Sequence, residues 1–452
     1  MQLPLERRLH MKKLLAVIIV FALMFSLCAC NTSVVIDGLE KLGELELPPL
    51  PGEEAEESET EPAETEPTAE PLPVEEVPET NEFEPANRVI VSISKTTLQH
   101  FAPDDGAKLL LTFAYDRPIV SIEGRDDAAH KINDFTAFLE EEHYTGMDGE
   151  EYTGYGFYGM IEQAEDNYRY VHDTGADLPI EYASSRAVDV LRADTNVLSL
   201  VYNDYVYTGG AHGNFGDRAY VFDTESGERL ALEDLCADYA TLSDALTDYM
   251  ANAAENDEEV SMRIDPNLIA DGDYKTAFAA LLRAGSWYLS CEGLVIFSDV
   301  YEFGSYAQGA IKFVVPYEEL EGLIDAKWIP ANVSGGCELS VVDKPAEGTE
   351  ILDMINVDEN GRTFYVVIDG IAGQLKLAGV QYADSFYETA EYWYCSYAEN
   401  CALQISAIIP EGMPNLMLSY TDESGMQHNI LISESGADGS LIITDDSIEA
   451  VG

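Results

Sequence analysis

Residues 197–213 read VLSLVYNDYVYTGGAHG, a strand-like run that ends in a glycine-rich turn, and the other elements can be placed around them. The first half of this run is dense in branched and aromatic residues, which favour β-strands. Gly209 and Gly210 permit positive φ angles, which a sharp turn or a ligand-binding loop requires. We therefore expect a strand that ends at Tyr207, and Tyr207, Gly209, Gly210 and His212 are candidate ligand contacts.

His212 allows two interpretations. Its ring could contact a ligand, or it could satisfy neighbouring backbone carbonyl groups in a structural turn. We favour the structural role, because one histidine without a partnered nucleophile or acid does not form a catalytic site. The turn is also unlike a phosphate-binding loop, since it lacks both the P-loop lysine and the dinucleotide glycine spacing.

The flanking sequence predicts a mixture of helices and strands. Apolar residues recur at helical spacing over 128–143 and again over 242–253, so each segment should form an amphipathic helix. Short branched runs predict strands at 89–93, 109–113, 293–297 and 311–316. This pattern indicates an α+β domain with antiparallel sheets and packed helices, in two halves at 86–205 and 206–328.

Helical periodicity disappears after residue 330, and residues 336–452 are expected to form a separate, small, all-β domain. Its last strands, expected at 403–409, 415–420, 428–432 and 440–444, have the spacing of a meander. Within it, Tyr392, Trp393 and Tyr394 are neighbours and cannot all point the same way in a strand. We therefore expect this tyrosine-rich run to expose aromatic surface.

The N-terminus resembles a bacterial lipoprotein signal. Two lysines precede an apolar run from Leu14 to Leu27, which is too short to span a bilayer and is followed by a small residue and Cys30. Residues 1–29 are expected to be a signal peptide with a lipobox, cut before Cys30, which would carry the lipid. The alternative is an ordinary signal peptide cut elsewhere. The lipid would anchor the protein to the extracellular face of the cell membrane.

Residues 30–85 have the composition of a tether. Between residues 44 and 85 there are sixteen glutamates, nine prolines and no lysine or arginine. Such a segment contains too little apolar surface to offset the entropy of ordering, and its like charges repel. We expect a disordered acidic linker that holds the folded part away from the lipid.

The charge of the chain limits its partners. Against 24 lysines and arginines stand 84 acids, which gives a formal net charge of −60. Nucleic acid is excluded as a partner, because its binding requires basic residues that displace counterions from phosphates. The electrostatic field of this negative charge would attract cationic proteins. Acidity of this kind can also serve solubility alone.

Seven cysteines are present; Cys28 would leave with the signal peptide, and Cys30 would carry the lipid. Five remain, an odd number, so at least one thiol should stay free. Cys395 and Cys401 are close enough in sequence for a disulfide that closes a hairpin. The histidines and cysteines show no zinc-binding spacing, and we expect neither a metal nor a cofactor.

Several motifs together resemble a known extracellular module. In chain order they are Tyr115–Ile119, Tyr205–Gly213, Tyr301–Gly309 and Phe313–Leu320, all within residues 88–325. The chain resembles a paired domain of uncertain chemistry that occurs in the anti-sigma-V factor, which senses lysozyme. The same pair lies ahead of the catalytic domain of a peptidoglycan muramic-acid deacetylase.

The resemblance implies a recognition module. Tyr301 and Tyr306 are further candidate ligand contacts, because aromatic residues with polar tips can stack on sugar rings or fill an interface, although such residues more often pack in a core. Loop 302–309 departs from the family because it lacks the usual proline. The C-terminal region has no Asp-Asp and His-x-x-x-His pattern of a deacetylase, and we expect no catalytic activity. The expected partner is lysozyme or another cationic wall-active protein. The alternatives are a peptidoglycan-binding protein and a wall hydrolase that uses paired carboxylates.

Overall fold

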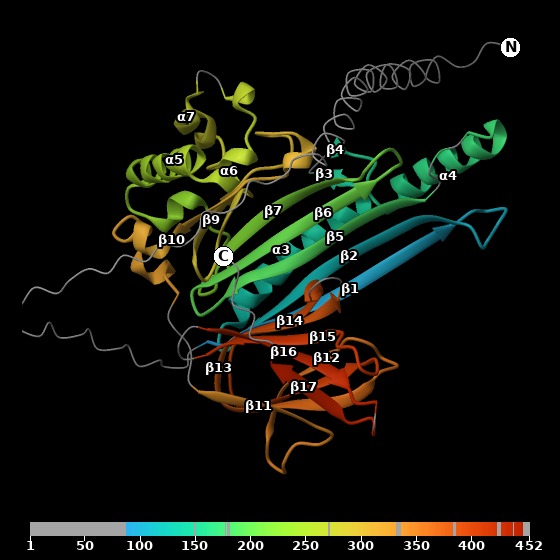
Figure 1. Ribbon diagram of the computed structural model, residues 1–452, viewed down its shortest axis with the longest axis vertical. Helices are drawn as coiled ribbons and strands as arrows, with labels where there is room; N and C mark the ends of the chain where they lie inside the picture. Colours follow the sequence, from blue (N-terminus) through green and yellow to red (C-terminus); the bar gives the residue numbers. More distant parts are fainter. Residues whose placement is uncertain are drawn as a thin grey trace, which may run out of the picture. The chain divides into compact units, whose positions relative to one another are not determined.

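The computed structural model describes residues 87–445, except 149–150, 177, 179–180, 270–271, 331–335, 383–385, 423–425 and 437. The signal peptide, Cys30 and the acidic linker lie outside the described residues. All described residues belong to one compact unit. The architecture is α+β, as the sequence predicted (Figure 1). None of the helices in this part of the chain is both long and apolar enough to cross a membrane.

The main sheet has twelve strands, and its path runs β17-β16-β15-β13-β14-β1-β2-β5-β6-β7, with β11 beside β13 and β12 beside β14. Its first half is built from β1 (Val89–Phe101), β2 (Leu109–Ile122), β5 (Tyr182–Ala193), β6 (Val197–Tyr207) and β7 (Asn214–Asp223). Most neighbours are antiparallel, but β2 pairs with β5, and β12 with β14, in parallel. Antiparallel pairing therefore dominates, as expected, and the sheet is mixed only at these two places among the described strands.

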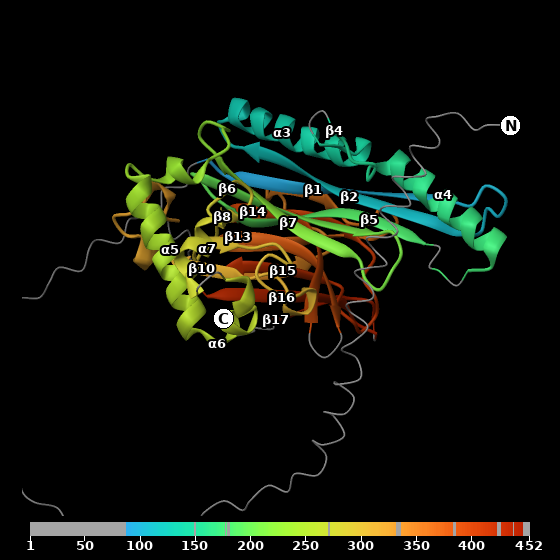
Figure 2. The ribbon, with the colours of Figure 1, turned by 90° about the horizontal axis from the view of Figure 1, so that it is seen from above.

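Two helices lie along one face of this sheet, α3 (Asp126–Thr145) and α4 (Phe157–Thr174) (Figure 2). Between them is a short hairpin of β3 (Met147–Asp148) and β4 (Glu151–Tyr152). The helix expected at 128–143 is confirmed by α3, whose Ile132 and Leu139 are buried against the sheet. The sequence did not predict α4, because only Gly159, Met160 and Ala164 are buried along it.

A second hydrophobic core lies on the opposite face of β6 and β7, where a small sheet and three helices pack. The sheet contains β8 (Trp287–Leu289), β9 (Gly293–Phe297) and β10 (Lys312–Pro316), all antiparallel. The helices are α5 (Tyr239–Asn256), α6 (Glu258–Met262) and α7 (Tyr274–Ala279). The helix expected at 242–253 is confirmed by α5, whose apolar face packs into this core.

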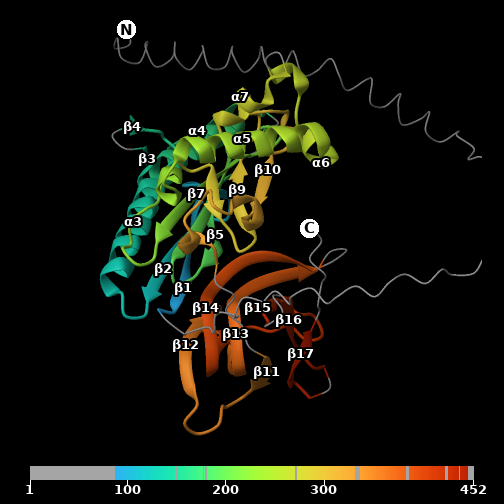
Figure 3. The same cartoon turned by 90° about the vertical axis from the view of Figure 1, so that its left-hand side faces the viewer.

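The C-terminal region is all β, as expected, and its strands curve around a core of their own (Figure 3). The strands are β11 (Cys337–Val342), β12 (Glu350–Asn356), β13 (Arg362–Tyr382), β14 (Phe386–Ala407), β15 (Leu416–Thr421), β16 (Gln427–Glu434) and β17 (Leu441–Asp445). The last three form the expected meander. The run expected at 403–409 instead belongs to β14, which does not pair with β15.

The domain division remains a prediction, but the main sheet crosses two of its boundaries. The boundary between residues 205 and 206 falls inside β6, which continues to Tyr207. The C-terminal strands continue the sheet of the first half, because Val91 in β1 pairs with Tyr394 in β14. One sheet therefore connects segments about 300 residues apart.

Two further expectations were wrong. Cys395 and Cys401 are free thiols and lie on the single strand β14, without a turn between them, so the disulfide that closes a hairpin is absent. The run Tyr392 to Tyr394 does not expose its rings as expected, because Trp393 and Tyr394 are buried on opposite faces of β14. Both faces of this strand pack into a core.

Candidate functional site

The glycine-rich loop joins β6 to β7 at the end of a regular antiparallel pair. Val206 pairs with Asn214, so residues 207–213 form the connection. Gly209 and Gly210 have φ angles of 92° and 108°, which are strained for any other residue type. The Tyr207 hydroxyl donates to the Gly210 carbonyl over 3.1 Å. The glycines therefore allow the chain to reverse, and Tyr207 braces the turn.

Gly213 is required for a different reason, the close approach of an aromatic ring. A Cβ atom at this position would lie 2.3 Å from the ring of Tyr205. Its carbonyl oxygen accepts a hydrogen bond from the Tyr306 hydroxyl over 3.2 Å and lies 2.8 Å from His212 Nδ1. This glycine joins the loop to residue 306, more than ninety positions further along the chain.

Four aromatic rings meet at this loop and form the aromatic patch: His212, Phe215, Tyr301 and Tyr306. Tyr306 is central, because its ring stacks on His212 with centroids 4.0 Å apart. Phe215 and Tyr301 meet the same ring at 5.4 and 5.7 Å. Tyr301 is 54% exposed and has a φ of 67°, a conformation that tyrosine rarely adopts. The patch thus presents aromatic surface to solvent.

Acidic residues flank the aromatic patch. Glu302 follows Tyr301 directly and accepts hydrogen bonds from the Asp299 amide and from both terminal nitrogens of Arg283. Burial raises the pKa of Glu302, but these hydrogen bonds outweigh burial and hold it below its ordinary value. Asp299 and Glu302 together outnumber the single arginine. The loop that carries the patch is therefore net acidic.

The structure brings together three of the residues predicted from sequence, His212, Tyr301 and Tyr306. Tyr207, Gly209 and Gly210 shape the loop and stand outside the cluster of rings. The His212 ring contacts a backbone carbonyl, as the structural interpretation expects, yet it is exposed and stacked. Sequence reasoning missed Phe215, although its place two residues after Gly213, next to the candidate loop, was a usable signal.

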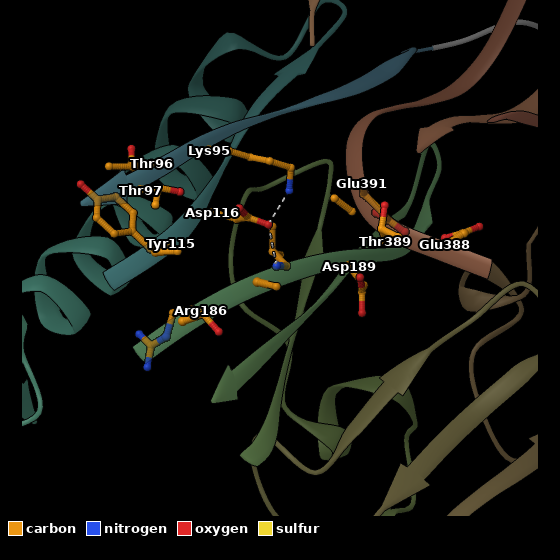
Figure 4. Close-up of a pocket in the computed structure, with 15 residues that line it drawn as sticks. Lys95, Thr96, Thr97, Tyr115, Asp116, Arg186, Asp189, Glu388, Thr389 and Glu391 are labelled. Carbon is orange, nitrogen blue, oxygen red and sulfur yellow. Dashed lines mark hydrogen bonds and ion pairs between the residues drawn. The ribbon is translucent and has the colours of Figure 1, made fainter. Parts of the chain in front are cut away.

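A second feature, also missed, is a cleft of about 350 Å³ lined by β1, β2, β5 and β14 (Figure 4). Its acidic and basic side chains are Lys95, Asp116, Arg186, Asp189, Glu388 and Glu391. The Lys95 ammonium binds the Asp116 carboxylate over 2.8 Å at one side. Within the described ranges, no group of three or more histidine, cysteine or acidic residues is placed to hold a metal ion.

Glu391 is the most deeply buried acid of this cleft, with 6% of its surface exposed. Its Oε2 accepts the backbone N–H of Val190 over 2.8 Å, and its other oxygen lies 3.4 Å from the Lys376 ammonium. Burial raises the pKa of Glu391 to about 7, because desolvation outweighs the attraction of Lys376. The side chain therefore connects β14 to the backbone of β5.

Two family models match this chain. One, described as deacetylase PdaC, matches residues 110–215, and the other, a protein of unknown function called DUF3298, matches residues 233–318. Both lie within the region 88–325, so the resemblance to PdaC is confirmed at the level of these domains. The resemblance to the anti-sigma-V factor remains a prediction. The aromatic patch draws residues from both matched segments.

Two solved structures are similar to this chain. A DUF3298 family member from Bacteroides fragilis shares 21% identity at a TM-score of 0.40, and the match covers 52% of this chain and 94% of that one. A DUF3298 family protein from Pseudomonas aeruginosa shares 15% identity at a TM-score of 0.35, and the match covers 53% of this chain and 97% of that one. No curated protein matches the chain.

Proposed function

We propose that this protein is a lipid-anchored, non-catalytic recognition module on the extracellular face of the cell membrane. Its ligand is lysozyme or another cationic wall-active protein, bound at the aromatic patch. The observation that carries the proposal is the set of exposed rings around Tyr306, beside Asp299 and Glu302. Lysine and arginine side chains bind well to aromatic faces next to carboxylates.

The matched families support the class of function. The segment that resembles PdaC ends at the loop that carries His212, and the DUF3298 segment contains Tyr301 and Tyr306. The predicted resemblance to the lysozyme-sensing anti-sigma-V factor supplies the ligand class. The lipobox at Cys30 and the acidic linker support the anchor, and for both of these the support is sequence alone.

The net charge of the protein and the aromatic patch would contribute to binding in different ways. A net charge of −60 draws cationic proteins towards the surface, but screening limits this field to about 8 Å at physiological salt. Contacts at the rings are short-ranged and survive salt. Affinity that persists at physiological salt would therefore come from the aromatic patch, and the long-range field would mainly raise the rate of encounter.

Calorimetric titration with lysozyme tests the proposal. The protein is the chain from Cys30 onward with Cys30→Ser, titrated at low and physiological salt beside an equally basic unrelated protein. We expect lysozyme binding that survives salt and excludes the unrelated protein. Binding that salt abolishes, or that includes the unrelated protein, would reject specific recognition and favour the alternative ligand, peptidoglycan. Release of muropeptides from purified wall would instead indicate a hydrolase.

Tyr306→Ala should weaken lysozyme binding by at least about ten-fold, since it removes the ring that orders the other three. Tyr170→Ala on α4 is the control, because it truncates an exposed tyrosine that lies outside the aromatic patch. Both variants should melt within a few degrees of the parent, which separates lost binding from lost folding. Equal affinity for the two variants would place the binding site away from the aromatic patch.

A further inference from the structure

A cavity of about 270 Å³ lies on the α3 face of the main sheet, at the C-terminal end of that helix. The strand registers place Ser184 and Arg186 of β5, Asp204 of β6 and Arg218 of β7 on this same face. α3 ends at Gly146, whose φ of 72° stops the helix. The last turn of α3 contributes Glu142 and His143 to the lining, and the strand residues form its floor.

One wall of the cavity is formed by residues that follow α3, and backbone contacts at Gly146 fix their position. A Cβ atom on Gly146 would lie 2.4 Å from the backbone nitrogen of Gly156, so the two chain segments cross in close contact. The Thr153 amide and hydroxyl both donate to the Gly146 carbonyl, over 2.8 and 2.9 Å. Met147 and Tyr155 complete this wall, and the Tyr155 ring is half exposed. The backbone therefore holds the cavity open.

Some of its polar groups are already paired and others are not. Arg186 donates to both Asp204 oxygens, over 2.6 and 2.8 Å, and to the Leu139 carbonyl. Ser184 is 1% exposed, and its hydroxyl has no partner among the described residues; the same holds for His143 Nε2. Burial holds the pKa of His143 down to about 4, so the ring is neutral. A buried polar atom without a partner is unfavourable, and a ligand hydroxyl that reached either atom would relieve this.

We propose that this cavity binds one neutral pyranose ring of a carbohydrate. Its formal charges cancel, because Arg186 and Arg218 face Asp204 and Glu142. Donors and acceptors are both present, as sugar hydroxyls require, and Tyr155 offers an aromatic wall for a ring face. Within the described part of the chain, Arg218 makes no salt bridge, but its side chain hydrogen-bonds Tyr220. A guanidinium carries five N–H donors, so others remain to bind a ligand.

The volume of the cavity and the net charge of the protein limit the class of ligand. Binding pockets for small molecules usually hold about 300–1,000 Å³. This cavity of about 270 Å³ lies just below that range, so it suits one ring and not a chain. An anion would be opposed by the net charge of −60, which a neutral sugar does not feel. The site is independent of the aromatic patch, and it goes beyond the proposed function.

Saturation-transfer NMR tests the proposal, with N-acetylglucosamine and glucose as neutral probes, glucuronate as the anionic analogue and sorbitol as an acyclic polyol. The chain from Cys30 onward with Cys30→Ser should bind a neutral pyranose saturably at millimolar concentration and favour it over glucuronate and sorbitol. A preference between N-acetylglucosamine and glucose would separate a wall sugar from a free hexose. No saturable binding of either sugar, or tighter binding of glucuronate, would overturn the inference.

Variants locate the site. Ser184→Ala combined with Arg218→Gln should weaken sugar binding by at least about ten-fold while the melting temperature stays within a few degrees. Arg169→Gln, an exposed arginine on α4, is the matched control and should not change binding. Tyr306→Ala should also leave sugar binding unchanged, which separates this site from the lysozyme proposal. Unchanged sugar affinity in the double variant would place the sugar elsewhere.

Discussion

Replacing Arg192 with methionine should lower the free energy of unfolding by about 3–5 kcal/mol, the cost of removing one partner from a buried ion pair. The Arg192 side chain is fully buried. Its Nε bonds the Asp194 carboxylate over 2.6 Å, and Nη1 donates to the Tyr317 hydroxyl and the Trp328 carbonyl, both over 2.7 Å. Methionine fills the space of the aliphatic stem, but it supplies none of these hydrogen bonds.

The position of Arg192 explains why the effect should be large. Arg192 lies in the segment that resembles PdaC, and Tyr317 lies in the DUF3298 segment and donates to the Ser290 carbonyl in turn. The arginine therefore connects β5 to the second core through a continuous hydrogen-bonded chain. Its loss would leave the Trp328 carbonyl without its donor and the Asp194 carboxylate without its countercharge.

Urea unfolding followed by circular dichroism measures this effect. Arg169→Met is the matched control, since the same substitution at an exposed arginine should change stability by less than about 0.5 kcal/mol. Tyr317→Phe, alone and with Arg192→Met, completes a double-mutant cycle whose coupling energy should be nonzero. A loss below about 1 kcal/mol for Arg192→Met would show that the buried network contributes little to stability.

Local patterns predicted those elements whose signal lies within one segment. The strand that ends at Tyr207 and the helices α3 and α5 show clear periodicity, and the structure confirms them. α4 was missed, because its charged and tyrosine residues leave only a narrow buried stripe around Met160 and Ala164. A narrow stripe gives too few apolar matches to distinguish a helix from a loop.

Strand partners were harder to predict than strands. Nothing within β14 indicates that Tyr394 pairs with Val91, because register over such a distance is decided by packing on both faces. The same limit applies to the sites. His212 and Tyr306 were candidates separately, but their stacking depends on the fold, and the cleft around Glu391 combines residues of four strands. Individual candidate residues could be predicted from the sequence, but the contacts between them could not.

Glu391→Gln should make the protein more stable at pH 7.5 but not at pH 4.5. The folded protein holds the pKa of Glu391 at about 7, above its ordinary value of 4.5. A raised pKa means that the folded state binds the proton more tightly, so this stabilisation is complete below pH 4.5 and is lost as the pH rises through 7. Ionisation at neutral pH therefore costs stability, and glutamine avoids that cost.

The size of the effect follows from the pKa difference. One pKa unit corresponds to about 1.4 kcal/mol, so the advantage of the glutamine variant should grow by about 2–3 kcal/mol between pH 4.5 and 7.5. Glutamine keeps an oxygen that can accept the Val190 N–H, and Lys376 keeps Glu388 at 2.8 Å. The substitution thus removes the buried charge and preserves the contact between β14 and β5.

Urea unfolding of parent and variant at several pH values measures the difference directly, and the comparison cancels the titration of all other acids. Glu388→Gln is the matched control, because it removes a carboxylate from the same lysine at an exposed position and should show no such trend. A glutamine variant that is less stable than the parent at pH 7.5 would show that the Lys376 pair outweighs desolvation. Glu391 would then be held ionised in the folded sheet, and the contact between β14 and β5 would depend on its charge.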